Sequence, residues 1–230
     1  SFFHPKIKFG NITSLNLLEI DEFIIFKFYI NNAKRYKRFV DIGANIGVHS
    51  IINSKLGLEV LSYEPDPWHM KLLKKNITKN KINVKKTKLF QCAVSNKDKT
   101  SSFTRVLGNT TGSHITGSKK DVYNKIKKFN VKVISATKIV KKNDLVKIDA
   151  EGEEAKIIGS LKKTQLQEND FICEIGNEKN AKIIFKKLKK LNIASYSQKN
   201  NFKIVKKIND FPVTYKEGSL LISSKNRWKI

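Results

Sequence analysis

Residues Phe39–Gly47, with the sequence FVDIGANIG, decide the fold of this chain. An apolar strand runs directly into a glycine turn, and a segment with helical periodicity follows from Val48. Gly43 lets the backbone turn tightly, Gly47 permits close packing of helix on strand, and free amides at the helix start attract a carboxylate. The stretch predicts a small-ligand site at the first turn of an α/β fold. The alternative is that both glycines serve only the turn.

The spacing of the glycines discriminates between ligands. Dinucleotide folds hold a pyrophosphate with G-x-G-x-x-G, whereas Ala44 stands in this turn and leaves G-x-x-x-G preceded by Asp41. An acid at this place repels a pyrophosphate and suits an ammonium group, such as that of S-adenosylmethionine. We therefore expect cofactor contacts from Asp41, Gly43, Asn45 and Gly47.

Two further stretches complete this expected cofactor site. Glu64 ends a second strand 23 positions after Asp41, close to the roughly 20-residue separation at which an acid accepts hydrogen bonds from a ribose. Pro65 follows it, and Cys92 and Ala93 lie where backbone amides and small side chains flank an adenine ring. The alternatives are that Glu64 caps the next helix and that Ala93 is simply core.

Short β-rich runs alternate with helical patterns from Arg38 onward, which is typical of a mostly parallel, doubly wound sheet. The expected strands are residues 39–42, 60–63, 89–94, 145–148 and 171–175. The expected helices are residues 48–55, 67–80, 153–161 and 177–191.

Five further segments surround or extend this core. Residues 20–33 read as an amphipathic helix that caps the sheet or covers the ligand cleft. Residues 102–106 read as an extra strand, and the polar residues 108–118 as a lid. Residues 202–207 and 219–222, joined through Pro212, predict a terminal antiparallel hairpin.

Length and composition indicate one globular domain, residues 1–230, with an amino-terminal helical cap (1–37) and a Rossmann-like core (38–230). No run approaches the roughly 20 apolar residues of a membrane-spanning helix. Cys92 and Cys173 both lie in apolar segments that read as strands, so neither a disulfide framework nor a cysteine-rich metal site is expected. Without a secretory signal, a cytoplasmic location is expected.

The formal net charge of +26 is typical of nucleic-acid-binding proteins. Lysines dominate the 46 basic residues and are scattered over the whole chain, which is rich in Asn and Ile, as an AT-rich genome encodes. A nucleic-acid surface more often uses arginine and interleaved aromatics. Nucleic acid is therefore the less favoured partner, although the charge does not exclude it.

Four blocks of the sequence resemble, in order, those of the FkbM family of methyltransferases. They are VDIGANIG (40–47), YEPDP (63–67), CAVS (92–95) and KIDAEGEE (147–154). The last block distinguishes this family from other cofactor-binding folds of the same class. The resemblance implies a Rossmann-like class I methyltransferase fold, S-adenosylmethionine as cofactor, and usually methyl transfer to a hydroxyl of a sugar or other small metabolite.

Methyl transfer from a sulfonium needs an aligned acceptor and a group that removes or polarises its proton. Asp149 ends the fourth expected core strand, where ligands of open α/β sheets bind, and Glu151 follows on the turn. The two act as a proton acceptor and an orienting group, or jointly hold a divalent cation. Helix capping is the alternative role. His114, in the expected lid, is the third catalytic candidate.

Other ionisable residues have weaker assignments. Lys147 and Glu174 interrupt apolar strands, and we expect Glu174 to reach the cleft or Lys147. His49 is expected beside the cofactor, and His69 at the surface.

The leading hypothesis is an O-methyltransferase acting on a small hydroxylated metabolite or a sugar or glycan precursor. The first alternative is an RNA methyltransferase with the same cofactor site. It is opposed by the absence of an Asn-Pro-Pro-aromatic or Pro-Cys signature. The second alternative, an adenosine-ligand or NAD-dependent protein, is opposed by the glycine spacing. The sequence assigns neither the acceptor nor the oligomeric state.

Overall fold

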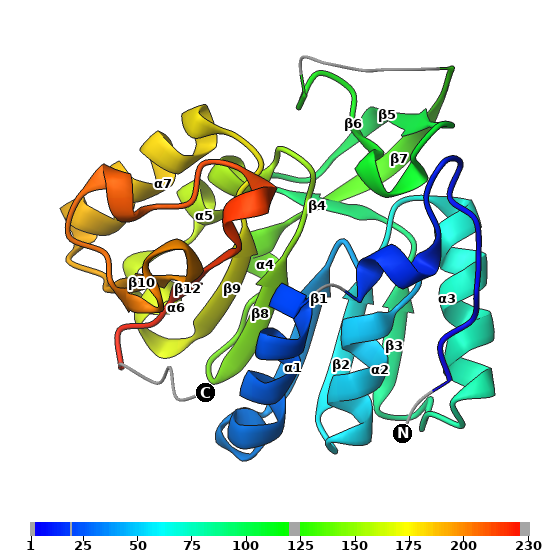
Figure 1. The fold of residues 1–230 in the computed structure, drawn as a ribbon, viewed down its shortest axis with the longest axis horizontal. Coiled ribbons are helices and arrows are strands. Elements are labelled where there is room, and N and C mark those ends of the chain that lie inside the picture. The colour runs from blue at the N-terminus through cyan, green and yellow to red at the C-terminus, as the bar shows by residue number, and fades with distance from the viewer. Residues whose placement is uncertain (1–2, 19, 120–124, 226–230) are drawn as a thin grey trace.

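A computed structural model describes residues 3–18, 20–119 and 125–225. Its main sheet has eight strands in the order β11-β10-β12-β9-β8-β1-β2-β3 (Figure 1). These strands are β1 (Arg38–Ile42), β2 (Glu59–Tyr63), β3 (Thr87–Phe90), β8 (Asp144–Ile148), β9 (Asp170–Glu174), β10 (Ser195–Ser197), β11 (Lys203–Ile204) and β12 (Ser219–Ile222).

The five central strands, β3, β2, β1, β8 and β9, run parallel to one another. β12 pairs antiparallel with β9, β10 with β12, and β11 with β10. The expectation of a mostly parallel, doubly wound sheet is confirmed. Because the carboxyl ends of the parallel strands meet at one edge, this topology gathers the polar residues that follow them.

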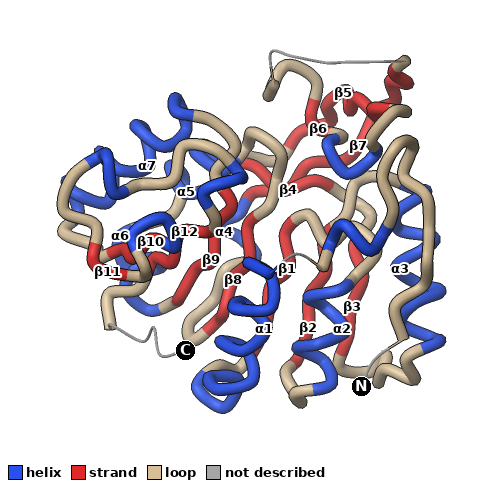
Figure 2. Tube along the Cα trace, viewed as in Figure 1, coloured by secondary structure: helices blue, strands red, loops and turns tan. Residues whose placement is uncertain are grey.

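The helices cover both faces of the main sheet (Figure 2). They are α1 (Ile20–Asn32), α2 (Val48–Lys55), α3 (Pro67–Lys79), α4 (Ala136–Ile139), α5 (Glu154–Ser160), α6 (Lys163–Glu168) and α7 (Glu178–Leu191). Alternate residues of each strand point to opposite faces. Phe39 therefore packs with α1 and α2, whereas its neighbour Val40 packs with α5 and α7.

The short 3-10 helices join these elements. They are η1 (Ser14–Leu17), η2 (Ala33–Arg35), η3 (Thr110–Gly112), η4 (Gln198–Asn200), η5 (Ile208–Asp210) and η6 (Tyr215–Glu217). None of the helices in the described ranges has the length and apolar composition that a membrane crossing requires.

A second sheet of four strands, in the order β4-β7-β5-β6, stands over the carboxyl ends of the main sheet (Figure 1). Its strands are β4 (Ala93–Ser95), β5 (Lys99–Val106), β6 (His114–Ile115) and β7 (Ile126–Ser135). The single strand expected at residues 89–94 is wrong, because Cys92 donates its N–H to the Phe90 carbonyl in a turn (2.9 Å). The chain leaves the main sheet there and enters the second one, so Cys92 lies in neither strand.

Two other expectations about strands are corrected. Residues 203–204 pair with β10, and β12 lies between β9 and β10, so the expected hairpin of 202–207 with 219–222 does not form. The long strand β7 was not expected, because lysines and Asn130 break its apolar pattern. It pairs with β5 along eight residues and fixes the second sheet.

Candidate active site

A cavity of about 1270 Å³ opens at the carboxyl ends of β1, β8 and β9. A smaller pocket of about 50 Å³ adjoins it, and both are lined by Gly43, Asn45, Asp149 and Glu151. Ligand pockets usually measure roughly 300–1,000 Å³. The large cavity has room for a cofactor and a second small molecule together.

The glycine turn after β1 forms one wall of both spaces. Gly43 has φ +81°, and a Cβ added there would lie 1.8 Å from the carbonyl oxygen of Asp149. Gly47 has φ +90°, and its Cβ would lie 2.1 Å from Leu73 Cδ1 of α3. Gly43 therefore allows the turn to approach the end of β8, and Gly47 allows α3 to pack on the turn.

Glu64, at the end of β2, is hydrogen-bonded to this turn. Its Oε2 accepts the backbone N–H of Asn45 (2.8 Å), and its Oε1 accepts that of Asp66 (2.8 Å). The cap of α3 is Asp66, whose carboxylate accepts the Trp68 N–H (2.8 Å), so the alternative that Glu64 caps this helix is wrong. Two carboxylate oxygens offer about four acceptor sites, so Glu64 keeps capacity for further hydrogen bonds.

The other expected cofactor residues divide between the pocket and the core. Pro65 and Ala93 line the smaller pocket. Cys92 is buried and lines neither space, and burial raises the pKa of its thiol to about 11. Asp41 is fully buried and also lines neither space; its Oδ2 accepts the Ser50 hydroxyl at 2.6 Å.

Lys147 occupies the floor of the large cavity beside Asp41. Strand register places Asp41 opposite Lys147, and Lys147 Nζ lies 3.1 Å from Asp149 Oδ2. Burial lowers the pKa of Lys147, but Asp149, Asp41, Glu22 and Glu174 raise it more, so the pKa lies above its ordinary value. Glu174 lines the same cavity, as expected from its place in an apolar strand.

Glu151 is paired with a different lysine. It forms an ion pair with Lys119, which follows the second sheet's β6. The alternative role considered for Glu151 was capping of the next helix. At the start of α5 it is Glu154 that accepts the Gly152 N–H (2.9 Å). Asp149 and Glu151 each pair with their own lysine, and within the described ranges no group of three His, Cys, Asp or Glu is placed to hold a metal ion. The divalent-cation hypothesis gains no support.

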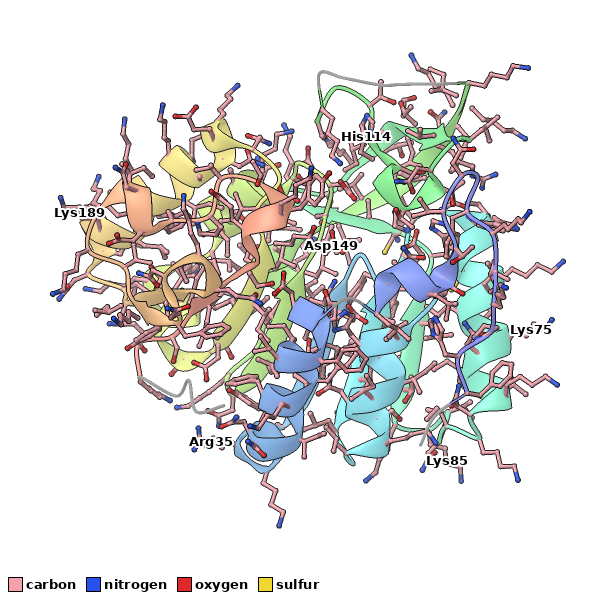
Figure 3. The ribbon with its side chains drawn as sticks, in the orientation of Figure 1. Arg35, Lys75, Lys85, His114, Asp149 and Lys189 are labelled. Atoms are coloured by element: carbon pink, nitrogen blue, oxygen red, sulfur yellow. The ribbon has the colours of Figure 1, made fainter. Side chains whose placement is uncertain are left out.

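His114 lies apart from Asp149 (Figure 3). It is 2% exposed in the second sheet and lines neither space. Its Nδ1 donates to the Gly112 carbonyl oxygen at 3.0 Å, and burial lowers its pKa. The structure thus brings Asp149 and Glu151 together at the cavity and leaves His114 inside the sheet above it.

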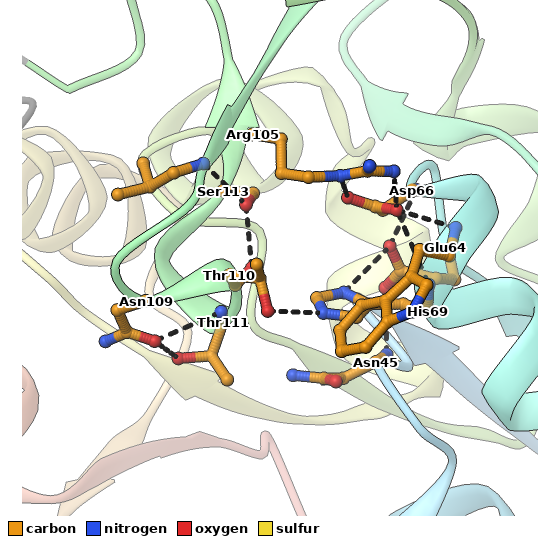
Figure 4. Close-up of polar contacts among 11 residues, drawn as sticks. Asn45, Glu64, Asp66, His69, Arg105, Asn109, Thr110, Thr111 and Ser113 are labelled. Carbon is orange, nitrogen blue, oxygen red and sulfur yellow. Dashed lines mark hydrogen bonds and ion pairs between the residues drawn. The ribbon is translucent and has the colours of Figure 1, made fainter. Parts of the chain in front are cut away.

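The segment 108–118, expected as a lid, contacts α3 through a hydrogen bond (Figure 4). Thr110 Oγ1 lies 3.0 Å from His69 Nε2, and Arg105 Nε donates to Asp66 Oδ2 at 2.6 Å. The expectation that His69 lies at the surface is wrong, because it is 3% exposed. Its imidazole joins α3 to the segment that covers the pocket.

The contacts between His49 and helix α1 were not anticipated from the sequence. His49 lines the large cavity, and its Nε2 lies 3.2 Å from Glu22 Oε2 of α1. Its Nδ1 lies 3.0 Å from the Tyr29 hydroxyl. The signal available in the sequence was the pair of acids, Asp21 and Glu22, at the start of an otherwise apolar helix.

The charge of the large cavity is opposite to that of the chain. Its lining contains, among the described residues, seven of the chain's 20 acids but only four of its 46 basic residues. The acids are Asp21, Glu22, Asp149, Glu151, Glu154, Glu174 and Glu178, and the lysines are Lys119, Lys147, Lys156 and Lys179. The outward-pointing lysines, such as Lys75, Lys85 and Lys189, lie elsewhere (Figure 3).

The family profile described as Methyltransferase FkbM domain matches residues 41–201. Among solved structures, methyltransferase FkbM from Methylobacillus flagellatus is similar with a TM-score of 0.53 and 11% identity, covering 82% of this chain and 44% of that one. This chain therefore spans less than half the length of that structure. None of the curated proteins matches this chain in sequence.

Other solved methyltransferases are similar at lower scores. Precorrin-6y C5,15-methyltransferase from Geobacter metallireducens has a TM-score of 0.47 and 11% identity, over 90% of this chain and 88% of that one. The N-terminal domain of human METTL16, in complex with SAH, has a TM-score of 0.43 and 13% identity, over 97% and 75%. The architecture is that of Rossmann-like class I methyltransferases, as the resemblance implied.

Proposed function

This chain belongs to the FkbM family of methyltransferases, and on that premise we propose that it transfers a methyl group from S-adenosylmethionine to a hydroxyl of a small acceptor, such as a sugar or glycan precursor. The observation that carries the proposal is the acidic cavity at the carboxyl ends of β1, β8 and β9. Both Gly43 and Asp149 line it, so a cofactor and an acceptor fit in one space.

The residues around the smaller pocket fit the cofactor. Gly43 and Asn45 line this pocket, and Asn45 has a buried Oδ1 without a protein partner. Glu64 keeps acceptor capacity for two ribose hydroxyls, and Pro65 and Ala93 supply small apolar walls for an adenine ring. S-adenosylmethionine supplies an activated methyl group when it is bound.

The remaining steps belong to the side chains of this chain. Asp149, at the cavity and 30% exposed, orients the acceptor hydroxyl and polarises its proton. Lys147 holds the Asp149 carboxylate in position, with its Nζ 3.1 Å from Asp149 Oδ2. Glu151 contributes a second carboxylate, held by Lys119, at the entrance shared by both spaces.

The acidic lining favours a small neutral acceptor over nucleic acid. Phosphates are repelled by an excess of carboxylates, whereas sugar hydroxyls donate hydrogen bonds to them. The lysines that give the chain its charge lie mostly outside the cavity. This distribution supports the hydroxylated metabolite over the RNA alternative.

The amino-terminal residues 1–37 are proposed to form part of the active site together with the core at 38–230. Glu22 of α1 lines the large cavity and contacts His49 of α2. We propose that both parts act as one catalytic unit, 1–230, in which α1 closes one side of the acceptor space.

The test is transfer of a labelled methyl group from S-adenosylmethionine to a panel of neutral sugars, phosphorylated sugars and RNA. The proposal expects label on a neutral sugar, and loss of that label in Asp149→Asn. Glu168→Gln, a change in α6 at a carboxylate that lines neither space, is the matched control and keeps activity. Transfer to RNA alone would overturn the assignment of the acceptor.

A further inference from the structure

Strand register gathers three carboxylates around Lys147. Asp41 of β1 lies directly opposite Lys147 of β8. β8 and β9 are paired up to Ile148 and Cys173, so the next residues, Asp149 and Glu174, end the two strands at the same level. Side chains two residues apart on a strand share a face, so Lys147 and Asp149 point the same way.

A fourth carboxylate reaches the same place from a helix. Glu22 of α1 faces Lys147, and α1 packs on this face of the sheet. Lys147, Asp149, Glu174 and Glu22 all line the large cavity, whereas Asp41 lies buried beneath it. One ammonium is thus surrounded by four carboxylates, an excess of negative charge next to the proposed cofactor and acceptor space.

Glu174 lies among these charges at the end of β9. Burial raises its pKa, Asp149 adds to the effect, and the pKa lies at about 8 although Lys147 acts in the opposite direction. Glu22 and Glu154 also raise the pKa of Glu174, and Lys119 is a second cation that interacts with it. At neutral pH Glu174 is mostly protonated until a positive charge enters the cavity.

We propose that Glu174 is a catalytic proton acceptor whose ionisation is coupled to the charge of the cofactor, so that this cluster holds the cationic sulfonium form more tightly than its neutral thioether product. The proposal rests on the proposed function of the same cavity. It assigns to Glu174 the catalytic role that was expected of His114, which is buried and lines neither space.

The proton and electron balance follows from the charges. Glu174 releases its proton to solvent when the sulfonium enters, because the added positive charge stabilises the carboxylate. During transfer the S–CH₃ bond breaks and its electron pair stays on sulfur, while an O–CH₃ bond forms. Glu174 then accepts the hydroxyl proton, because the loss of the sulfonium charge restores its high pKa. No further reactant is needed.

Calorimetric titration tests this coupling without any acceptor. S-adenosylmethionine and S-adenosylhomocysteine are each titrated at pH 7 in two buffers of different ionisation enthalpy, which gives the number of protons released on binding. A group with a pKa of about 8 is roughly nine-tenths protonated at pH 7, so the wild type should release about 0.9 proton more with the sulfonium ligand. The amino group that both ligands carry also titrates near neutrality. Its contribution is the same for every protein variant and cancels in the comparison.

The control variants separate Glu174 from the rest of the cavity. Glu174→Gln should lower this difference by about 0.9 proton, whereas Glu178→Gln should keep it. A second measurement needs no variant: the preference of the wild type for the sulfonium ligand should rise about tenfold from pH 7 to pH 9, because free Glu174 is then already ionised.

Two outcomes would overturn the proposal. A difference in proton release between the two ligands that is the same in the wild type and in Glu174→Gln shows that Glu174 does not sense the sulfonium. Failure of the folded wild type to bind either ligand refutes the proposed function itself, and this inference with it. The two failures are therefore distinguishable.

Discussion

Replacing Gly43 by alanine tests whether the glycine turn must touch the end of β8. Two costs add at this position. An alanine at φ +81° costs roughly 1–2 kcal/mol, because its Cβ approaches the following carbonyl in the left-handed region. The same Cβ would lie 1.8 Å from the Asp149 carbonyl oxygen, so the backbone must separate, and overpacking of this kind costs about 1–3 kcal/mol more.

Gly57 provides a matched control for the first cost. Its φ is +93°, and a Cβ there meets nothing within 4 Å. Gly57→Ala should therefore lower the free energy of unfolding by about 1–2 kcal/mol and leave cofactor affinity unchanged. Gly43→Ala should lower it by about 3 kcal/mol and abolish cofactor binding, because Asp149 is displaced from the cavity.

Both variants are measured by guanidinium unfolding and by calorimetric titration with S-adenosylmethionine. The difference between their unfolding free energies isolates the close approach at Asp149 from the backbone strain common to both. Equal destabilisation by the two substitutions, or wild-type cofactor affinity in Gly43→Ala, would refute the reasoning.

Three further changes have defined outcomes. Glu64→Gln places an amide NH₂ against one of the two backbone N–H donors, so cofactor affinity by calorimetry should fall at least tenfold, or about 1.4 kcal/mol; unchanged affinity would contradict the ribose assignment. Arg38→Met leaves Asp144 buried without its 2.6 Å ion-pair partner and should cost about 3–5 kcal/mol in denaturant unfolding, whereas a loss below about 1 kcal/mol would show that the pair contributes little. Burial raises the pKa of Glu153, but hydrogen bonds from Lys156 and two serines outweigh it and lower the pKa overall. Its stabilisation is present above pH 4.5 and is lost as pH falls further, so Glu153→Gln should flatten the acid side of the stability profile; an unaltered profile would assign that acid sensitivity to other groups.

Much of the fold could be predicted because its signals are local. The run from Phe39 to Gly47 specifies a strand, a turn and a helix start through apolar pattern and glycine placement alone. Asp66 before Pro67 signals the start of α3 in the same way, and the structure confirms it as the helix cap. The order of these units then determines which strand ends meet at the cavity.

The second sheet could not be predicted, since its pairing is not local. β7 carries exposed lysines at positions 127, 128 and 132 and pairs with β5 from the far side of the segment 108–118. Burial of His69 and His114 follows from that pairing and from the packing of the segment on α3. A histidine in a polar stretch gives no sign in the sequence of whether a sheet will cover it.

In the candidate site too, residues placed by local sequence pattern could be predicted, whereas residues placed by tertiary packing could not. Glu64 and Gly43 were identified from spacing, because both lie in the βα units whose geometry is fixed by local pattern. Glu22 was not identified, because its approach to His49 depends on how α1 packs against α2. Lys147 and Glu174 were identified only as anomalies in apolar strands, and strand register explains why they occur together.

A crystal structure of this chain with S-adenosylhomocysteine tests the proposed site directly. We predict that the ligand lies between the Gly43 turn and Glu64, with both ribose hydroxyls on the Glu64 carboxylate, adenine against Ala93 and the thioether facing Asp149. A ligand bound elsewhere, or a pocket that stays closed at saturating ligand, would contradict the assignment of this cavity to methyl transfer.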